Sequence, residues 1–288
     1  MKILERIEKR QSMRAYTRKE LSRTEIAEAE AYFHKCRRLI PSIEVEFMIF
    51  TGDTHEKLNG MIGYQGNAFN APAYLVILSE KADYYYENSG YIAEDIILKL
   101  CELDLENCFI TVNDSDKVKE ILSIKSDKEV TTVIAFGQAK KEKNFFRLDI
   151  FSPSNVKVEK REGHIAPKIA QSELVFDGKW GVPVDWEEGM IDPVLDEAFY
   201  AASLAPSFLN LQPYRFINQG HRILILTKKD DMVSDEDEKL GLGATLLNFY
   251  AVYSDYNPAA NRWVMGAPED AADLGEPADY HVVASLSI

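Results

Sequence analysis

Short apolar runs and one long apolar helical stripe stand out along the chain. Residues 46–50, 72–78 and 130–136 are mostly apolar segments of strand length, which is typical of buried strands. Residues 91–103 instead repeat apolar positions at helical spacing and are too apolar overall for a surface helix. We therefore predict that this helix lies at an interface between two layers of the fold.

Capping residues mark further helices in the first half. Ser22 and Glu25 have the spacing of a capping box, so a helix is expected to begin near Ser22. Residues 3–14 and 54–61 also follow a helical pattern.

A similar order of elements recurs after a break. Residues 139–190 are charged and interrupted by Pro and Ser, and we place the link between two halves there. Beyond it, 193–204 and 240–252 predict helices, and 222–227 and 280–286 predict strands. Helix, loop, strand, apolar helix and strand thus follow one another in both halves, which is a repeat of pattern rather than of sequence.

Composition narrows the class of protein. The 288 residues are 46% hydrophobic and 28% charged, which predicts a globular chain of one large domain or two ordinary ones. The net charge of −14 disfavours nucleic acid and anionic membranes as partners, so an anionic ligand needs a local basic cluster. No apolar run approaches membrane-spanning length, and charges occupy the N-terminus where an export signal would be apolar. Three Cys argue against a disulfide framework, so we expect a reducing, cytoplasmic setting.

The first candidate site is Arg10-x-Ser12-x-Arg14. Two guanidiniums and a hydroxyl at alternate positions can converge on one anion, and the planar fork of Arg suits phosphate. Taken alone, the commoner interpretation is a pair of Arg on an exposed helix face.

The second candidate site follows the helix that stops at Pro206. Ser207, Asn210 and Gln212 then offer neutral donors and acceptors suited to a heterocycle edge or a polyol, before Pro213 stiffens the loop. The competing interpretation is an ordinary helix end and turn built from Pro, Ser and Asn.

These two motifs together resemble the signatures of the nitroreductase family of FMN-dependent oxidoreductases. In ordinary members one chain carries both signatures, forms a tight homodimer and holds each flavin between subunits. Here residues 40–46 lack the Asn and Gln-Pro of the second signature, and the second half lacks an Arg-x-Ser-x-Arg at its start. The signatures are complementary across the halves, so the chain resembles a fused pseudo-dimer with one complete flavin site between its repeats.

The resemblance implies an α+β fold. It consists of two pseudo-repeats, 1–155 and a more divergent 156–288, each a mainly antiparallel sheet packed with helices around central apolar helices. Because the interface is internal, the chain is expected to be a monomer or a homodimer.

Further residues are implied by the same resemblance. Asn70 is expected at the edge of the isoalloxazine ring, and Lys141 or Lys168 at the phosphate. The implied cofactor site is therefore made by Arg10, Ser12, Arg14, Asn70, Lys168, Pro206, Ser207, Asn210 and Gln212.

The function that the resemblance implies is an oxidoreductase. NADH or NADPH would reduce FMN, which would reduce a nitroaromatic, a quinone or a similar acceptor, and no side chain need act as acid or base because the flavin carries the hydride chemistry. The alternatives are a flavin-binding protein without turnover, serving as sensor or store, and a non-reductive flavin chemistry.

Other motifs are weak. Gly241-x-Gly243 opens a helix but lacks the third Gly and the preceding strand of a dinucleotide fingerprint. His and Cys lack metal-ligand spacing, so no metal is expected. Cys101 and Cys108 are expected in the core. Residues 230–238 are interpreted as a solvated acidic loop.

Overall fold

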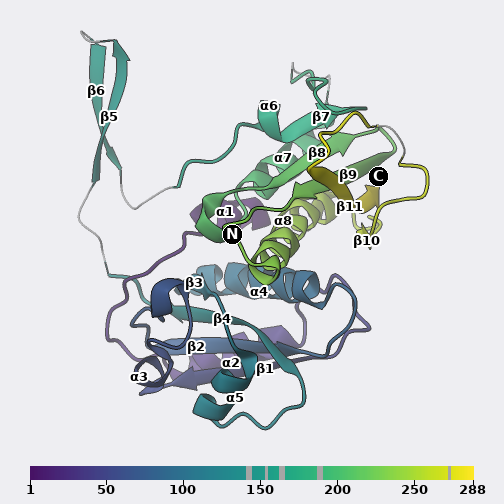
Figure 1. Ribbon diagram of the computed structural model, residues 1–288. Coiled ribbons are helices and arrows are strands. Elements are labelled where there is room, and N and C mark those ends of the chain that lie inside the picture. The colour runs from purple at the N-terminus through teal and green to yellow at the C-terminus, as the bar shows by residue number, and fades with distance from the viewer. Residues whose placement is uncertain (141–144, 153–154, 162–165, 187–190, 272–273) are drawn as a thin grey trace.

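The computed structural model describes residues 1–140, 145–152, 155–161, 166–186, 191–271 and 274–288. Two sheets lie on opposite sides of a central pair of helices (Figure 1). This is an α+β architecture with two helix-packed sheets, as the sequence predicts.

The first sheet is antiparallel throughout. Its strands, in spatial order, are β1 (Val45–Thr51), β2 (Ala73–Ser79), β4 (Glu129–Gly137) and β3 (Glu106–Ile110). The central strand β2 is buried along its whole length, which explains its unbroken apolar sequence. One face packs on α2 (Arg23–Phe33) and α4 (Tyr85–Glu102), and the other on α3 (Thr54–Leu58) and α5 (Ser115–Leu122).

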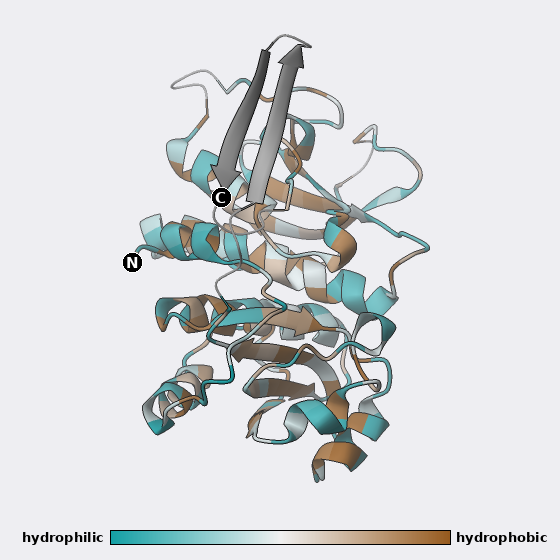
Figure 2. Cartoon of the chain, turned by 90° about the vertical axis from the view of Figure 1, so that its left-hand side faces the viewer, coloured by the Kyte–Doolittle hydropathy of each residue, from teal (hydrophilic) through white to brown (hydrophobic). Residues whose placement is uncertain are grey.

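The second sheet is antiparallel except for one parallel edge pair, β7 with β8. Its strands, in spatial order, are β10 (Val264–Met265), β11 (Tyr280–Ser287), β9 (Arg222–Lys228), β8 (Tyr214–Asn218) and β7 (Val175–Asp177). The helices α7 (Pro193–Ser203) and α8 (Asp235–Tyr256) pack against it. The short α6 (Gln171–Leu174) leads into β7. Figure 2 shows hydrophobic residues along the strands of both sheets and hydrophilic residues on outer helices and loops.

The two halves meet where α4 and α8 cross. A Cβ atom added to Gly90 would lie 2.1 Å from the carbonyl oxygen of Leu240, and one added to Gly243 would lie 2.1 Å from that of Glu87. The two backbones are thus close enough that only glycine fits at either position. Helix α4 is the apolar helix that the sequence predicts at an interface, and it packs against α8.

The N-terminal segment contacts both halves, and its helix is shorter than predicted. The helix expected over residues 3–14 ends after Lys9, as α1 (Ile3–Lys9), whose Ile7 belongs to the core of the second half. The chain then runs extended, with Ser12 bridging to Asn107 of β3 and the backbone N–H of Met13 donating to the carbonyl of Asn107 at 2.8 Å. The longer helix was a wrong prediction because these backbone groups find partners on the sheet edge instead.

Several elements were not expected from the sequence. Between the two halves the chain forms an antiparallel hairpin of β5 (Phe145–Ser152) and β6 (Asn155–Arg161). Strands β3 and β8 and helix α5 were also missed, whereas α2 begins as predicted, with Ser22 and Glu25 forming the capping box. The division of the chain at residue 155 stays a prediction. Among the described residues, no helix has the length and apolar character needed to cross a membrane.

The helix crossing generates the first testable prediction. Gly243→Ala should destabilise the protein by about 2 kcal/mol or more, because the added methyl group would overlap the α4 backbone. Chemical denaturation of the variant measures this loss.

Gly241→Ala is the matched control on the same helix. Its Cβ would meet nothing closer than 3.6 Å, so the variant should be as stable as the parent or gain up to about 1 kcal/mol. Equal stability of the two variants would contradict the close crossing.

Candidate functional site

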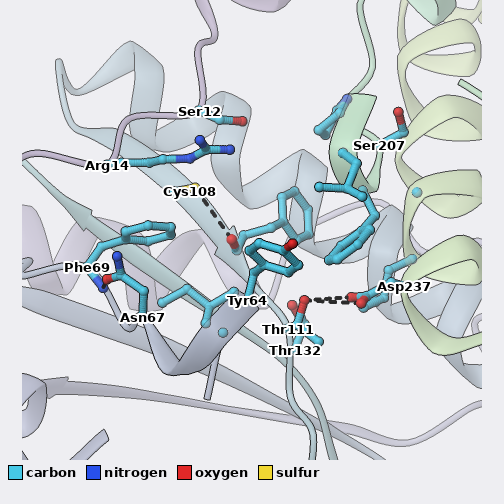
Figure 3. Close-up of a pocket in the computed structure, with 18 of the residues that line it drawn as sticks. Ser12, Arg14, Tyr64, Asn67, Phe69, Cys108, Thr111, Thr132, Ser207 and Asp237 are labelled. Atoms are coloured by element: carbon cyan, nitrogen blue, oxygen red, sulfur yellow. Dashed lines mark hydrogen bonds between the residues drawn. The ribbon is translucent and has the colours of Figure 1, made fainter. Parts of the chain in front are cut away.

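A cavity of about 470 Å³ lies between the two halves, beside the N-terminal end of α8. The first half contributes Ser12 and Arg14, the loop 63–69 and strand β3, and the second half contributes the loop 206–209 and the first turns of α8. Figure 3 shows these side chains converging on one space from both halves. Segments far apart in the sequence therefore build a single site.

The extended course after α1 sets the orientation of the first motif. In an extended chain alternate residues share a face, so residues 10, 12 and 14 point the same way. Ser12 and Arg14 line the cavity, and the Arg14 guanidinium carbon lies 5.9 Å from the centre of the Phe69 ring. Arg14 has no ion pair with any carboxylate in the described part of the chain, so its charge is available to a ligand.

Arg10 lies in a buried polar cluster and is not among the lining residues. Its Nε is 3.5 Å from Oε1 of Glu94 on α4, and its Nη1 donates to the Ser12 hydroxyl at 3.3 Å. Burial raises the pKa of Glu94, and the charges of Arg10 and Lys168 oppose that rise. The carboxylate therefore sits between two cations in the interior.

Lys168 completes this cluster from the second half. Its ammonium donates to the carbonyl of Ala205 at 2.7 Å and to Oδ1 of Asn210 at 3.1 Å. Burial, aided by the charge of Arg10, lowers the pKa of Lys168 to about 8. The alternative phosphate ligand, Lys141, lies outside the described residues.

The second motif uses its amides to hold its own loop. Gln212 Oε1 accepts from the N–H of Ile169 at 2.9 Å, and Asn210 Nδ2 donates to the carbonyl of Pro167 at 2.7 Å. Among the predicted residues of this loop, Pro206 and Ser207 line the cavity, whereas Asn210 and Gln212 do not. The amides thus fix the loop that presents Ser207.

Backbone strain concentrates at this site. Eight non-glycine residues in the described chain have positive φ, and five of them lie in the two loops that face each other across the cavity. Those five are Gln65, Phe69, Leu209, Asn210 and Gln212. Such conformations cost about 1–3 kcal/mol each and cluster where function requires a fixed geometry.

Asn70, which is predicted at the ring edge, does not line the cavity, but the nearby Asn67 does. Asn70 is exposed and is not among the residues that line the cavity, whereas Asn67 is. The chain turns between them, where Asn67 Oδ1 accepts from the N–H of Phe69 at 2.9 Å and Phe69 has positive φ. The hydroxyl of Tyr74 also donates to the carbonyl of Phe69 and anchors this turn.

Asp237 and Tyr64 are among the lining residues that were missed in the sequence. Asp237 was assigned to a solvated loop, but α8 begins at Asp235 and the Asp237 carboxylate accepts from the Thr111 hydroxyl at 3.1 Å. The Ser234–Asp237 spacing is a helix-start signal that could have located it, because the Ser234 side chain caps the Asp237 N–H. Tyr64 meets Phe208 edge to face across the two halves, with ring centres 6.1 Å apart.

Comparisons with known proteins identify the family. A family model described as "Putative TM nitroreductase" matches residues 2–252. The chain belongs to this nitroreductase family. Membership agrees with the resemblance carried by the two motifs and supports an oxidoreductase role.

One solved structure supports the fold over the whole chain, and two others match about half of it. A structure from Thermotoga maritima MSB8, described as a putative nitroreductase, is 16% identical with a TM-score of 0.60, covering 100% of this chain and 94% of its own. An FMN-dependent nitroreductase of Clostridium difficile R20291 matches 48% of this chain and 88% of its own, at 24% identity and a TM-score of 0.42. A protein from Clostridium acetobutylicum, described as a putative NADH oxidase, matches 48% of this chain and 89% of its own, at 21% identity and a TM-score of 0.41. No curated protein sequence matches the chain.

The half-buried carboxyl of Asp237 gives a second prediction. Burial raises its pKa in the folded state above the value of about 3.9 expected in the unfolded chain. Between these two values the folded state holds a proton that the unfolded state has released, so this carboxyl lowers stability as pH rises. The free energy of unfolding of Asp237→Asn minus that of the parent should therefore increase as pH rises from 4 to 8.

The control is Glu30→Gln, which removes an exposed carboxylate on α2. Its stability relative to the parent should be nearly independent of pH over that range. Denaturation series at several pH values measure both differences, and parallel profiles for Asp237→Asn and the parent would contradict the burial argument.

Proposed function

We propose that the chain binds FMN in the cavity between its halves and uses NADH or NADPH to reduce a nitroaromatic, a quinone or a similar electron-poor acceptor. The observation that carries the proposal is that Ser12 and Arg14 from one end of the chain and Pro206 and Ser207 from the other line the same cavity. One polypeptide then supplies both walls of the site.

The cavity fits the parts of a flavin nucleotide. Its volume of about 470 Å³ lies within the usual range of ligand pockets. Phe69, Ile110 and Leu240 provide apolar surface for a ring system, and Asn67 and Thr111 provide polar groups at its edge. A phosphate of about −1.5 to −2 charge needs fixed cations in a chain of net charge −14, and Arg14 faces the cavity.

The buried cluster beneath the cavity also suits an anion. Arg10 Nε and both Glu94 oxygens lack hydrogen-bond partners within the described structure, although they are buried. Unpartnered buried polar atoms are costly, so a phosphate oxygen that accepts from Arg10 Nε would relieve the cost at that atom. This favours Arg10, Ser12 and Lys168 as the phosphate-holding set, with Asn210 positioning the Lys168 amine.

FMN, when bound, supplies hydride acceptance and donation. The strained loops hold Asn67 and Ser207 in place before the ligand arrives, which limits the reorganisation needed on binding. Tyr64 and Phe208 narrow the space from opposite halves and favour flat acceptors.

The alternative is a flavin-binding protein without turnover, and donor oxidation distinguishes the two. The protein as purified should be yellow and release one FMN per chain on extraction. Steady oxidation of NADH or NADPH with a nitroaromatic or quinone acceptor supports the reductase, and FMN without donor oxidation supports the alternative.

Removal of the cavity-facing cation gives a third prediction. Arg14→Ala should weaken FMN binding at least tenfold, because a hydrogen bond to a charged group contributes ~1.5–3 kcal/mol. Fluorescence titration of the flavin-free protein measures the change, and Arg10→Ala combined with Arg14→Ala should leave the purified protein without flavin.

The matched control is Arg23→Ala, which removes an exposed guanidinium on α2. It should retain the FMN affinity of the parent. Full flavin occupancy in the double variant of Arg10 and Arg14 would refute the phosphate assignment.

The lowered pKa of Lys168 gives a fourth prediction. The amine of the flavin-free protein loses its proton as pH rises through about 8, whereas the FMN phosphate stays fully ionised above pH 7. FMN affinity should therefore fall from pH 7 to pH 9.5, by up to about tenfold per unit above the amine pKa.

Two substitutions test the origin of that slope. Lys168→Gln should bind FMN weakly, with an affinity that does not change with pH. The FMN affinity of Lys168→Arg should also be independent of pH, in this case because a guanidinium stays charged throughout. A flat profile in the parent would exclude the Lys168 amine from the phosphate site.

A further inference from the structure

A second cavity, of about 310 Å³, lies beside the same helix pair, outside the proposed flavin site. It is lined by the segment 37–39 after α2, by Tyr91 of α4, by Tyr250 and Ser254 of α8, and by residues within 258–263. None of these residues lines the first cavity.

The second cavity is the counterpart of the first when the two halves are exchanged. Gly90 and Gly243 hold equivalent places at the helix crossing. Tyr91, which follows Gly90, lines the second cavity, and Ala244, which follows Gly243, lines the first. The pair 109–110 lines the first cavity and 262–263 the second, and each pair follows its helix glycine at the same distance along the chain.

The loops that close the two cavities also correspond. Residues 206–209 follow the end of α7, and residues 37–39 follow the end of α2. Helix end, crossing helix and later segment thus match in both cavities, so the pseudo-symmetry predicted from the pattern of elements generates two sites rather than one.

Bulky side chains occupy part of the second cavity. Tyr91 stands where the first cavity has Ala244, and Trp263 stands where it has Ile110. Trp263 is held in place because its Nε1 donates to the carbonyl of Leu246 at 3.1 Å. The remaining space is suited to a ligand much smaller than a flavin nucleotide.

Three arginines give this cavity its chemistry. Arg37 is paired with the buried Asp95 at 2.8 Å, and this leaves Arg38 and Arg262, neither of which forms an ion pair within the described chain. The charges of Arg37 and Arg262 both act on the buried Tyr91 phenol and oppose the rise of its pKa, which places these guanidiniums near its hydroxyl. Asp95 offsets the charge of Arg37, and the remaining positive charge of Arg38 and Arg262 favours an anion in a protein of net charge −14.

We propose that this second cavity binds a small oxyanion carried on a single ring, such as an aromatic phosphomonoester. Guanidiniums bind the planar edge of a phosphate with two parallel hydrogen bonds, and the aromatic walls offer Tyr250 and Trp263 to the ring. The site does not depend on flavin binding in the first cavity.

The test is calorimetric titration of the full-length protein in saturating FMN, which occupies the first cavity, with phenyl phosphate and with benzyl alcohol as the neutral probe. Phenyl phosphate should bind at one site per chain, and benzyl alcohol should not bind. Arg38→Gln and Arg262→Gln should each weaken phenyl phosphate binding about tenfold, and the double variant should abolish it. Thermal unfolding of each variant checks that the fold is intact.

Two further arginines serve as matched controls. Arg23→Gln alters an exposed α2 residue and Arg14→Gln alters the first cavity, and both should leave phenyl phosphate binding unchanged. Loss of binding in Arg14→Gln but not in Arg38→Gln would assign the anion to the first cavity and overturn the proposal. No binding by the parent, or equal binding of benzyl alcohol, would also overturn it.

Discussion

The close approach of α4 and α8 at Gly90 and Gly243 is the contact on which the rest of the structure depends. It sets the distance between the two sheets and fixes the width of the spaces beside the helix pair. A side chain at either glycine would force the backbones apart, and the groups contributed by separate halves would lose their alignment. The site is thus determined by a packing constraint that contains no functional group.

A buried charge cluster and two loops with positive φ angles accompany that crossing. Glu94 places a carboxylate in the interior, where the charges of Arg10 and Lys168 offset it, and Arg10 also donates to the lining residue Ser12. The loops above the cavity hold their shape through side-chain amides rather than regular secondary structure. Conformational cost is therefore concentrated in the loops beside the first cavity, and the surrounding sheets provide the stability that supports it.

Much of the fold could be predicted because local signals agreed with the tertiary structure. The apolar run of β2 predicts a buried strand, and the capping box at Ser22 predicts a helix start. Both predictions agree with the structure. The end of α1 could not be predicted, since it depends on backbone partners on β3 that are distant in sequence. For the same reason the sequence placed the motif around Ser12 on a helix although the chain is extended there, and it favoured Asn70 although Asn67 is the asparagine that lines the cavity.

Covalent fusion of the two halves has an evolutionary consequence. In a symmetric homodimer one gene encodes both cavities, so a substitution that remodels one remodels the other. Here Ala244 and Tyr91 occupy corresponding places but are encoded separately. Each cavity is consequently under its own selection, and one can change its ligand while the other keeps its original task.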